Sequence, residues 1–306
     1  MHTFFNGAGG ANATNLNFIA LATIKFVEKR RMCPNCRAFI EINDRVCPYC
    51  GTQLGPRAID LRGSQIAASF MPRANLTSSV ILIVNALFYL IELLLSSQGT
   101  GGRGFSFGEV SGRAIVLLGC KYGPLIAAGQ WWRLITAGFL HGSFIHIAMN
   151  SYALFILVTE VEQFYGTSRL VVAYVFSTFT GFLVSFLWSP GAPSLGASAA
   201  AYGLIGIMLA MSIGRRSDPL VQLVRTQYTQ WLIFGLLLSL VGNIDLAAHL
   251  GGFAGGFLLG VVAGLPGIPR SRREVTWNVL AGLAIAVTIY AFYLDSLSFR
   301  MLSREL

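Results

Sequence analysis

Residues 195–213 read LGASAAAYGLIGIMLAMSI, an apolar stretch whose beginning carries Ser198. A later apolar stretch, residues 246–265, carries His249 near its own beginning. Polar side chains are costly in hydrocarbon, so a serine and a histidine on two such stretches need hydrogen-bond partners or a catalytic purpose. These stretches direct both the fold and the chemistry that we expect.

The composition of the chain excludes a soluble globular class. Its 306 residues are 54% hydrophobic and only 11% charged, with a mean hydropathy of +0.63. The formal net charge is +9, but the basic residues fall in short patches beside apolar stretches rather than along one stripe. We therefore expect an integral membrane protein that contacts lipid headgroups, and no nucleic-acid partner.

Seven stretches are apolar enough to be membrane helices, given that about 20 residues cross a hydrocarbon core. The second, fourth and fifth are short or polar at one end, as is expected of helices that line a wet cavity. The seven stretches are Leu76–Leu95, His146–Val161, Leu170–Trp188, Ser198–Ile213, Trp231–Val241 with its flanks, Leu246–Leu265 and Val275–Leu294.

Basic residues in the short loops predict the orientation, because such loops stay in the cytoplasm. They precede the fifth and seventh stretches, whereas residues 189–197 and 242–243 carry none. This predicts a multi-pass protein with a cytoplasmic amino terminus, and we favour a bacterial or archaeal plasma membrane. Ser198 and His249 then both lie near the outer face. The basic residues are Arg215, Arg216, Arg225, Arg270, Arg272 and Arg273.

The polar residues at this depth suit nucleophilic catalysis. A serine hydroxyl needs a base, and the imidazole of His249 can remove its proton near neutral pH. His146 and Asn150 lie four residues apart on one helical face and offer donors to an oxyanion, as do the free N–H groups at the start of the Ser198 helix. Asp245 is better interpreted as a helix N-cap. We therefore expect a Ser/His dyad.

Several motifs together resemble those of the rhomboid intramembrane serine proteases over residues 76–265. The motifs are Trp132-Arg133, His141-Gly142-Ser143-Phe144-Ile145-His146 running to Asn150, Gly196-Ala197-Ser198 followed by Tyr202, and Ala248-His249-Leu250-Gly251-Gly252. The resemblance implies an all-α membrane fold with six core helices and an appended seventh C-terminal helix. It also implies endopeptidase activity on substrates that are themselves transmembrane helices.

By this resemblance Ser198 is the nucleophile and His249 the general base. His146, Asn150 and the backbone N–H of Ser198 form the oxyanion hole, and the packing residues of the site are Tyr202, against the imidazole, and Gly196. The family usually has glycine directly after the nucleophile, where this chain has Ala199. Alanine is the smallest replacement and a good helix former, so we interpret it as tolerated.

Small residues line both helices that carry the dyad. Such residues let helix backbones approach closely, which is ordinary membrane packing when taken alone. Here the packing brings Ser198 and His249 together. In the outer loop, Trp132 and Arg133 are expected at the headgroup level, and His141 is expected to be structural. The small residues are Ala199, Gly203, Gly206 and Ala210 on one helix and Gly252, Gly256 and Gly260 on the other.

Two Cys-x-x-Cys knuckles, separated by ten residues, precede the membrane stretches. They contain Cys33 and Cys36, then Cys47 and Cys50. Four thiolates satisfy tetrahedral zinc. The competing interpretation is disulfides, which a reducing cytoplasm disfavours. We expect a structural Zn²⁺ site in a small zinc ribbon, with a cytoplasmic protein as a possible partner and no cofactor for catalysis.

The expected domains follow from these patterns. Residues 1–31 are disordered or precede the true start at Met32, residues 32–55 are the zinc ribbon, and residues 56–75 are a linker. The core comprises residues 76–265, and residues 266–306 contain a loop, the seventh helix and a short tail.

Two rival functions remain at this stage. One is a catalytically weak or inactive rhomboid-like protein that binds membrane helices, although such relatives usually lack the serine or the histidine. The other is a transport or proton pathway, which should carry polar groups through the inner leaflet as well.

Overall fold

A computed structural model describes residues 30–33, 35–41, 44–54, 76–99, 108–213, 218–241, 244–265 and 271–305. The chain divides into two compact units, Met1–Ala68 and Ser69–Leu306, and each is considered by itself. The predicted linker, nearly all of residues 1–31 and the basic residues Arg215, Arg216 and Arg270 lie outside the described residues.

The first unit contains an antiparallel hairpin of β1 (Arg30–Met32) and β2 (Phe39–Glu41), in which Arg31 pairs with Ile40. The core formed by its described residues is small: Cys33, Ile40 and Cys47 are buried, with Leu54 packed against them. So few apolar contacts do not stabilise a domain without a further crosslink.

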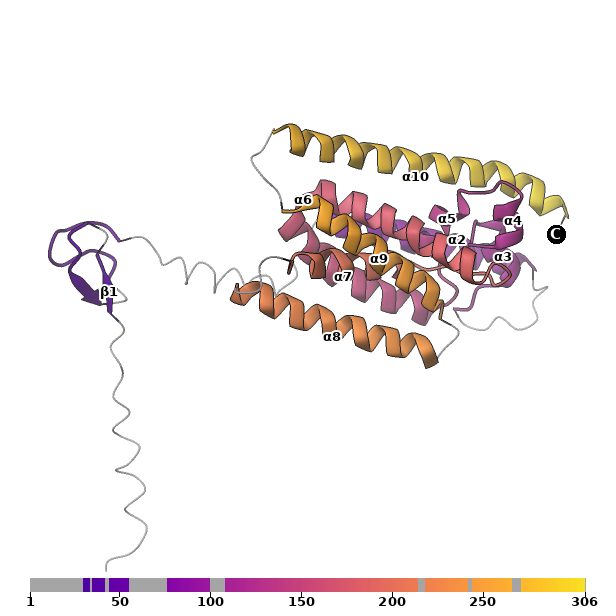
Figure 1. Cartoon of the computed structure of the whole chain (residues 1–306). Coiled ribbons are helices and arrows are strands. Elements are labelled where there is room, and N and C mark those ends of the chain that lie inside the picture. The colour runs from indigo at the N-terminus through magenta and orange to yellow at the C-terminus, as the bar shows by residue number, and fades with distance from the viewer. Residues whose placement is uncertain are drawn as a thin grey trace, which may run out of the picture. The chain divides into compact units, whose positions relative to one another are not determined.

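The second unit is a helical bundle (Figure 1). In the picture α10 and α8 flank the bundle on opposite sides, with α6, α7 and α9 between them. The long helices are α2 (Leu76–Gly99), α6 (Phe144–Trp188), α7 (Ser198–Ala210), α8 (Pro219–Val241), α9 (Leu246–Ala263) and α10 (Arg272–Glu305). Short helices α3 (Gly112–Leu117), α4 (Gly123–Ala127), α5 (Arg133–Thr136) and η1 (Ala137–Phe139) form the connection between α2 and α6.

Helix α6 accounts for two of the predicted membrane stretches. Gly166 interrupts it with φ of 77°, in the left-handed region that glycine adopts without strain. The halves, residues 144–165 and 167–188, correspond to the second and third predicted stretches. Each of the seven stretches therefore corresponds to a helix or to half of one, which confirms the predicted all-α membrane architecture.

Helix boundaries differ from the prediction in the fifth stretch. Helix α8 begins at Pro219, well before Trp231. The prediction placed its start too late because the mainly polar residues 225–230 interrupt the apolar signal before Trp231. Among the described residues, four helices are long and apolar enough to cross a membrane, namely α2, α6, α9 and α10. Helix α7 is apolar but shorter, in line with the short fourth predicted stretch.

Glycines bring α7 and α9 into backbone contact, as predicted. A Cβ atom at Gly252 would clash with the carbonyl of Ala199, and one at Gly256 would clash with the carbonyl of Gly203. On the other side, a Cβ at Gly206 would meet the backbone of Phe253. We call this contact the glycine seam; it holds the two helices that carry Ser198 and His249.

The connection between α2 and α6 is organised by Arg133, and here the prediction was wrong. Arg133 does not lie at a headgroup surface: its side chain is fully buried. Its Nη1 donates to the carbonyls of Val116 (2.9 Å) and Cys120 (3.0 Å), and its Nε donates to Gln130. A guanidinium offers five donors, so it can satisfy several loop carbonyls at once.

Helix α10 is joined to α6 by a buried ion pair. Arg169, 2% exposed, makes two hydrogen bonds to the carboxylate of Glu274, at 2.7 and 2.8 Å. The same guanidinium lies over the ring of Trp277, 5.1 Å from its centroid. The appended seventh helix is therefore attached to the bundle by specific polar contacts as well as by apolar packing.

Candidate active site

Ser198 and His249 meet across the glycine seam. Ser198 is the first residue of α7, and His249 lies one turn into α9. The Oγ of Ser198 lies 2.8 Å from Nε2 of His249, which is hydrogen-bond distance. The histidine is 5% exposed, and Ser198 is partly accessible. A reacting carbonyl can approach the hydroxyl while the imidazole stays shielded from water.

Tyr202 packs on the imidazole, as the resemblance implied. It lies one turn after Ser198 on α7, and its ring stacks on His249 with centroids 4.1 Å apart and planes 18° apart. This contact restricts rotation of the imidazole and keeps Nε2 directed at Ser198.

His146 lies on the other side of Ser198, against Gly196. Gly196 has φ of 128°, and a Cβ there would come within 2.7 Å of Nε2 of His146. Nδ1 of His146 accepts a long hydrogen bond, 3.4 Å, from the backbone N–H of Gly142. In a neutral imidazole the other nitrogen then carries the proton, so Nε2 is a donor that faces the Ser198 region.

Asn150 belongs to the same face of α6. Its side-chain nitrogen donates to the carbonyl of His146 at 3.0 Å, and the residue is 7% exposed. One amide proton remains for another acceptor. The first turn of α7 adds backbone donors, because its N-cap, Ala197, makes no side-chain capping bond. The residues predicted for the oxyanion hole thus lie on α6 and at the start of α7, and the imidazole of His146 lies against Gly196, two residues before Ser198.

Asp245 caps α9, as predicted, and takes no part in the contact between Ser198 and His249. Its carboxylate accepts from the backbone N–H of Ala248 at 3.0 Å and from the hydroxyl of Ser185. Burial opposes its ionisation, but these hydrogen bonds, one from Ser194 and the charge of Lys121 outweigh burial and lower the pKa of Asp245. The carboxylate is therefore ionised and fixes the start of the helix that carries His249.

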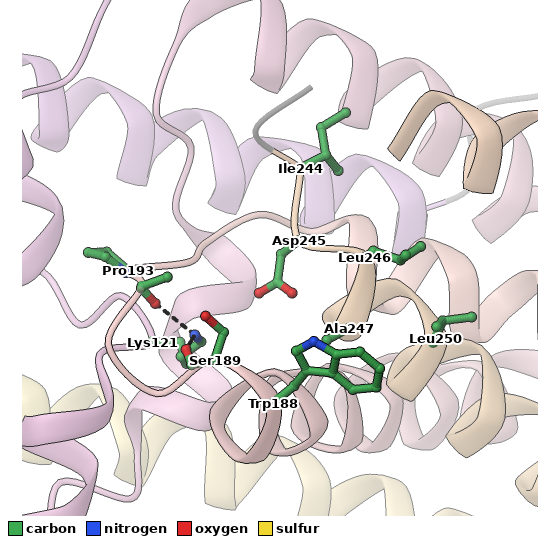
Figure 2. Close-up of a pocket in the computed structure, with 10 residues that line it drawn as sticks. Lys121, Trp188, Ser189, Pro193, Ile244, Asp245, Leu246, Ala247 and Leu250 are labelled. Carbon is green, nitrogen blue, oxygen red and sulfur yellow. Dashed lines mark hydrogen bonds between the residues drawn. The ribbon is translucent and has the colours of Figure 1, made fainter. Parts of the chain in front are cut away.

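A hollow of about 480 Å³ lies beside this cap. Figure 2 shows the Asp245 carboxylate and the Lys121 side chain near the turn that contains Ser189 and Pro193. The ammonium of Lys121 donates to the carbonyls of Ser189 (2.9 Å) and Ala192 (2.7 Å). Both charged groups are engaged by the protein, so they stabilise the loop around the hollow.

Sequence reasoning missed Ser239 on α8. Its hydroxyl oxygen lies 2.7 Å from Nδ1 of His249, the nitrogen opposite the one that faces Ser198. The only sequence signal is that Ser239 is the single hydroxyl-bearing residue in the apolar run 231–241. A serine in such a run ordinarily bonds to the carbonyl four residues earlier, so the signal is weak.

The four knuckle thiols gather in the first unit as a candidate metal centre. All four sulfur atoms lie within 4.8 Å of one another. The Sγ atoms of Cys33 and Cys50 are 3.6 Å apart, and those of Cys36 and Cys47 are 3.7 Å apart. Tetrahedral zinc with Zn–S bonds of about 2.3 Å needs sulfur atoms roughly 3.8 Å apart. The thiols are unpaired by disulfides and fit a metal ion.

Comparison with known proteins places these features in a family context. The Rhomboid domain family model matches residues 128–265. Rhomboid protease GluP of Bacillus subtilis (strain 168) is 34% identical over 213 residues, which cover 69% of this chain and 40% of that protein. Rhomboid-like protease 3 of Toxoplasma gondii is 32% identical over 182 residues, covering 58% of this chain and 66% of that protein.

A second Bacillus subtilis protein, YdcA, is named as a putative rhomboid protease. It is 34% identical over 140 residues, which cover 44% of this chain and 68% of YdcA. The chain spans less than two thirds of the length of the first two relatives. The region that the family model matches, residues 128–265, contains Ser198, His249, His146 and Asn150.

Proposed function

Because this chain belongs to the rhomboid family, we propose that it is an intramembrane serine endopeptidase that cleaves transmembrane-helix substrates near the outer face of the membrane. The observation that carries the proposal is the 2.8 Å contact between Ser198 Oγ and His249 Nε2, on two helices in backbone contact. Few arrangements other than nucleophilic catalysis justify such a polar pair between membrane helices.

The reaction begins with proton transfer. As Oγ of Ser198 attacks the scissile carbonyl carbon, its proton passes to Nε2 of His249. The carbonyl oxygen becomes an oxyanion, and the intermediate collapses when His249 returns the proton to the leaving amine. Water then hydrolyses the acyl-enzyme with His249 again acting as base, which restores Ser198.

The oxyanion forms on the His146 side of Ser198. We assign its stabilisation to Nε2–H of His146, the remaining amide proton of Asn150 and the backbone N–H of Ser198. Fixed donors aimed at developing charge need no reorganisation during the reaction, and loss of one such donor typically slows turnover by about 10² to 10³. Gly196 leaves the space that the imidazole of His146 requires.

Two assays in vesicles test the assignment of Ser198 as the nucleophile. One is labelling by a fluorophosphonate probe, and the other is cleavage of a reporter transmembrane substrate. The full chain should be labelled once, at Ser198, and the Ser198→Ala variant should neither react nor cleave. Ser212→Ala is the matched control, because the Ser212 hydroxyl bonds to Leu209 at the other end of the same helix. Cleavage by Ser198→Ala at the wild-type rate would contradict the proposal.

The same experiment separates the rival functions. A protein that binds membrane helices without proteolysis would retain the reporter yet leave it intact and unlabelled by the probe. A transport pathway would also leave Ser198 unreactive, since no nucleophile is activated there.

We assign the four-cysteine cluster to a structural Zn²⁺ site formed by Cys33, Cys36, Cys47 and Cys50. Residues 32–55 then form the zinc ribbon, residues 76–265 the catalytic core, and residues 266–306 the loop, seventh helix and tail. With the amino terminus in the cytoplasm of a prokaryotic cell, the ribbon can contact a cytoplasmic protein. Metal analysis of the purified chain tests the zinc assignment: about one zinc per chain is expected, and a chain without zinc would contradict it.

A further inference from the structure

The imidazole of His249 contacts a hydroxyl on each side. Ser198 on α7 lies at Nε2, and Ser239 on α8 lies 2.7 Å from Nδ1. Ser239 is 4% exposed, so its hydroxyl is shielded from water. Three different helices therefore supply the three members of this hydrogen-bonded row.

The direction of the hydrogen bonds follows from counting protons. A serine hydroxyl carries one proton, and we assign that of Ser239 to the carbonyl of Gly235, which lies 2.8 Å away and can only accept. The oxygen of Ser239 must then accept at its contact with His249, which requires a proton on Nδ1. In a neutral imidazole Nε2 is then unprotonated and accepts from Ser198, which is the state a general base needs.

We propose that Ser239 is a positioning residue that holds His249 in the Nδ1–H tautomer and stabilises the imidazolium that forms when Ser198 loses its proton. The inference rests on the proposed function. An acidic residue has this part in a Ser-His-Asp triad. Here Asp245 is committed to Ser185 and the helix cap, and a neutral hydroxyl from α8 takes the position.

Contacts around Ser239 keep α8 at the required distance. Tyr202, which stacks on His249, is also a hydrogen-bonding neighbour of Ser239. Gly235 lies one turn before Ser239, and a Cβ there would clash with the hydroxyl of Tyr202. Absence of a side chain at residue 235 thus lets α8 approach the imidazole closely enough for the Ser239 contact.

The test removes the hydroxyl and measures the chemistry of Ser198 directly. In Ser239→Ala, we expect kcat for a reporter transmembrane substrate to fall about tenfold with KM unchanged, because one hydrogen bond to the base is lost. Fluorophosphonate labelling of Ser198 should slow by a similar factor. The small probe does not depend on docking of a transmembrane helix, so a change in substrate binding alone would leave its rate unaltered.

Two further variants test the role of the Ser239 hydroxyl if Ser239→Ala folds poorly. Ser239→Thr and Ser239→Val have nearly the same shape and differ in the hydroxyl; labelling should be about tenfold faster in the threonine variant. Thr226→Ala is the control on α8, because the Thr226 hydroxyl also donates to a carbonyl four residues earlier, at 3.0 Å, away from the site.

Two results would overturn the inference: wild-type labelling by Ser239→Ala, or equal rates for the threonine and valine variants. Failure of the proposed function is distinguishable, because the wild-type chain itself would then be neither labelled nor active.

Discussion

The dyad and the thiol cluster both bring side chains within hydrogen-bond reach of one another, but the protein around them is organised in opposite ways. Ser198 and His249 lie on helices whose backbones touch along the glycine seam, inside a large buried core. The thiols of Cys33, Cys36, Cys47 and Cys50 lie in a unit whose described residues include three buried core residues, two of which are cysteines themselves. The dyad adds two residues to a core formed by many apolar residues, whereas two of the four thiols are themselves core residues.

The two sites differ in what supplies the folding free energy of the unit around them. In the bundle, packing of glycine, alanine and apolar residues aligns the dyad, so catalysis can be removed without unfolding. In the ribbon, a bound metal must supply the folding free energy that the small core lacks. Four experiments test this contrast between the bundle and the ribbon.

The largest expected effect is that of metal removal. Zinc binding to small four-ligand units contributes about 10–16 kcal/mol of apparent free energy at neutral pH. A strong chelator, or Cys47→Ser, should therefore unfold the ribbon while labelling of Ser198 continues at the wild-type rate. Limited proteolysis of the full chain measures the first outcome, as new cleavage within residues 32–55. Protease resistance of this segment without metal would show that the contrast is false.

Next comes the glycine seam. Gly256→Leu places a side chain against the backbone of Gly203, which cannot move aside. Overpacking typically costs about 1–3 kcal/mol and more against a rigid backbone, so we expect roughly 4 kcal/mol or failure to fold, with loss of probe labelling. Thermal unfolding in detergent measures the effect. Gly282→Leu is the control, because a Cβ at Gly282 meets open space; equal destabilisation of both variants would exclude a special role of the seam.

A smaller effect is expected at the ion pair between α6 and α10. Glu274→Gln leaves the buried guanidinium of Arg169 without its countercharge, at a cost of about 3 kcal/mol. The double variant Arg169→Met with Glu274→Gln removes both charges and should recover most of that loss. Thermal midpoints in detergent measure both. If the double variant is less stable than the single one, the loss of stability in Glu274→Gln comes from losing the ion pair rather than from leaving Arg169 unpaired.

The smallest effect concerns Ala199, the departure from the usual glycine. Its methyl group lies against Gly181 in the core, and the residue is 1% exposed. It points away from any oxyanion, so Ala199→Gly should leave kcat within about twofold and cost about 1 kcal/mol of helix propensity. Ala201→Gly is the matched control, because it too removes a buried methyl group from α7. A large gain in turnover by Ala199→Gly alone would mean that the methyl group crowds the site.

Local patterns explain which features were predictable. Seven membrane stretches follow from hydropathy over about 20 residues, and each corresponds to a helix or half-helix of the structure. The Asp245 cap and the knuckles follow from residue spacing alone. The start of α8 was placed too late because the mainly polar residues 225–230 separate Trp231 from the apolar residues that follow Pro219. Arg133 was assigned to the surface because charge alone does not reveal that loop carbonyls converge on it.

By itself the sequence determined the membrane class, the helices, the metal-binding spacing and the candidates Ser198 and His249, because all of these depend on residue type within a short window. Helix packing, by contrast, sets which nitrogen of His249 faces Ser198, that Ser239 contacts the other nitrogen, and that the Ala199 methyl group lies in the core. Those facts depend on how residues 10 to 51 positions apart meet across packed helices. These contacts depend on the close approach of helix backbones at glycines, and that approach cannot be predicted from any single stretch of the chain.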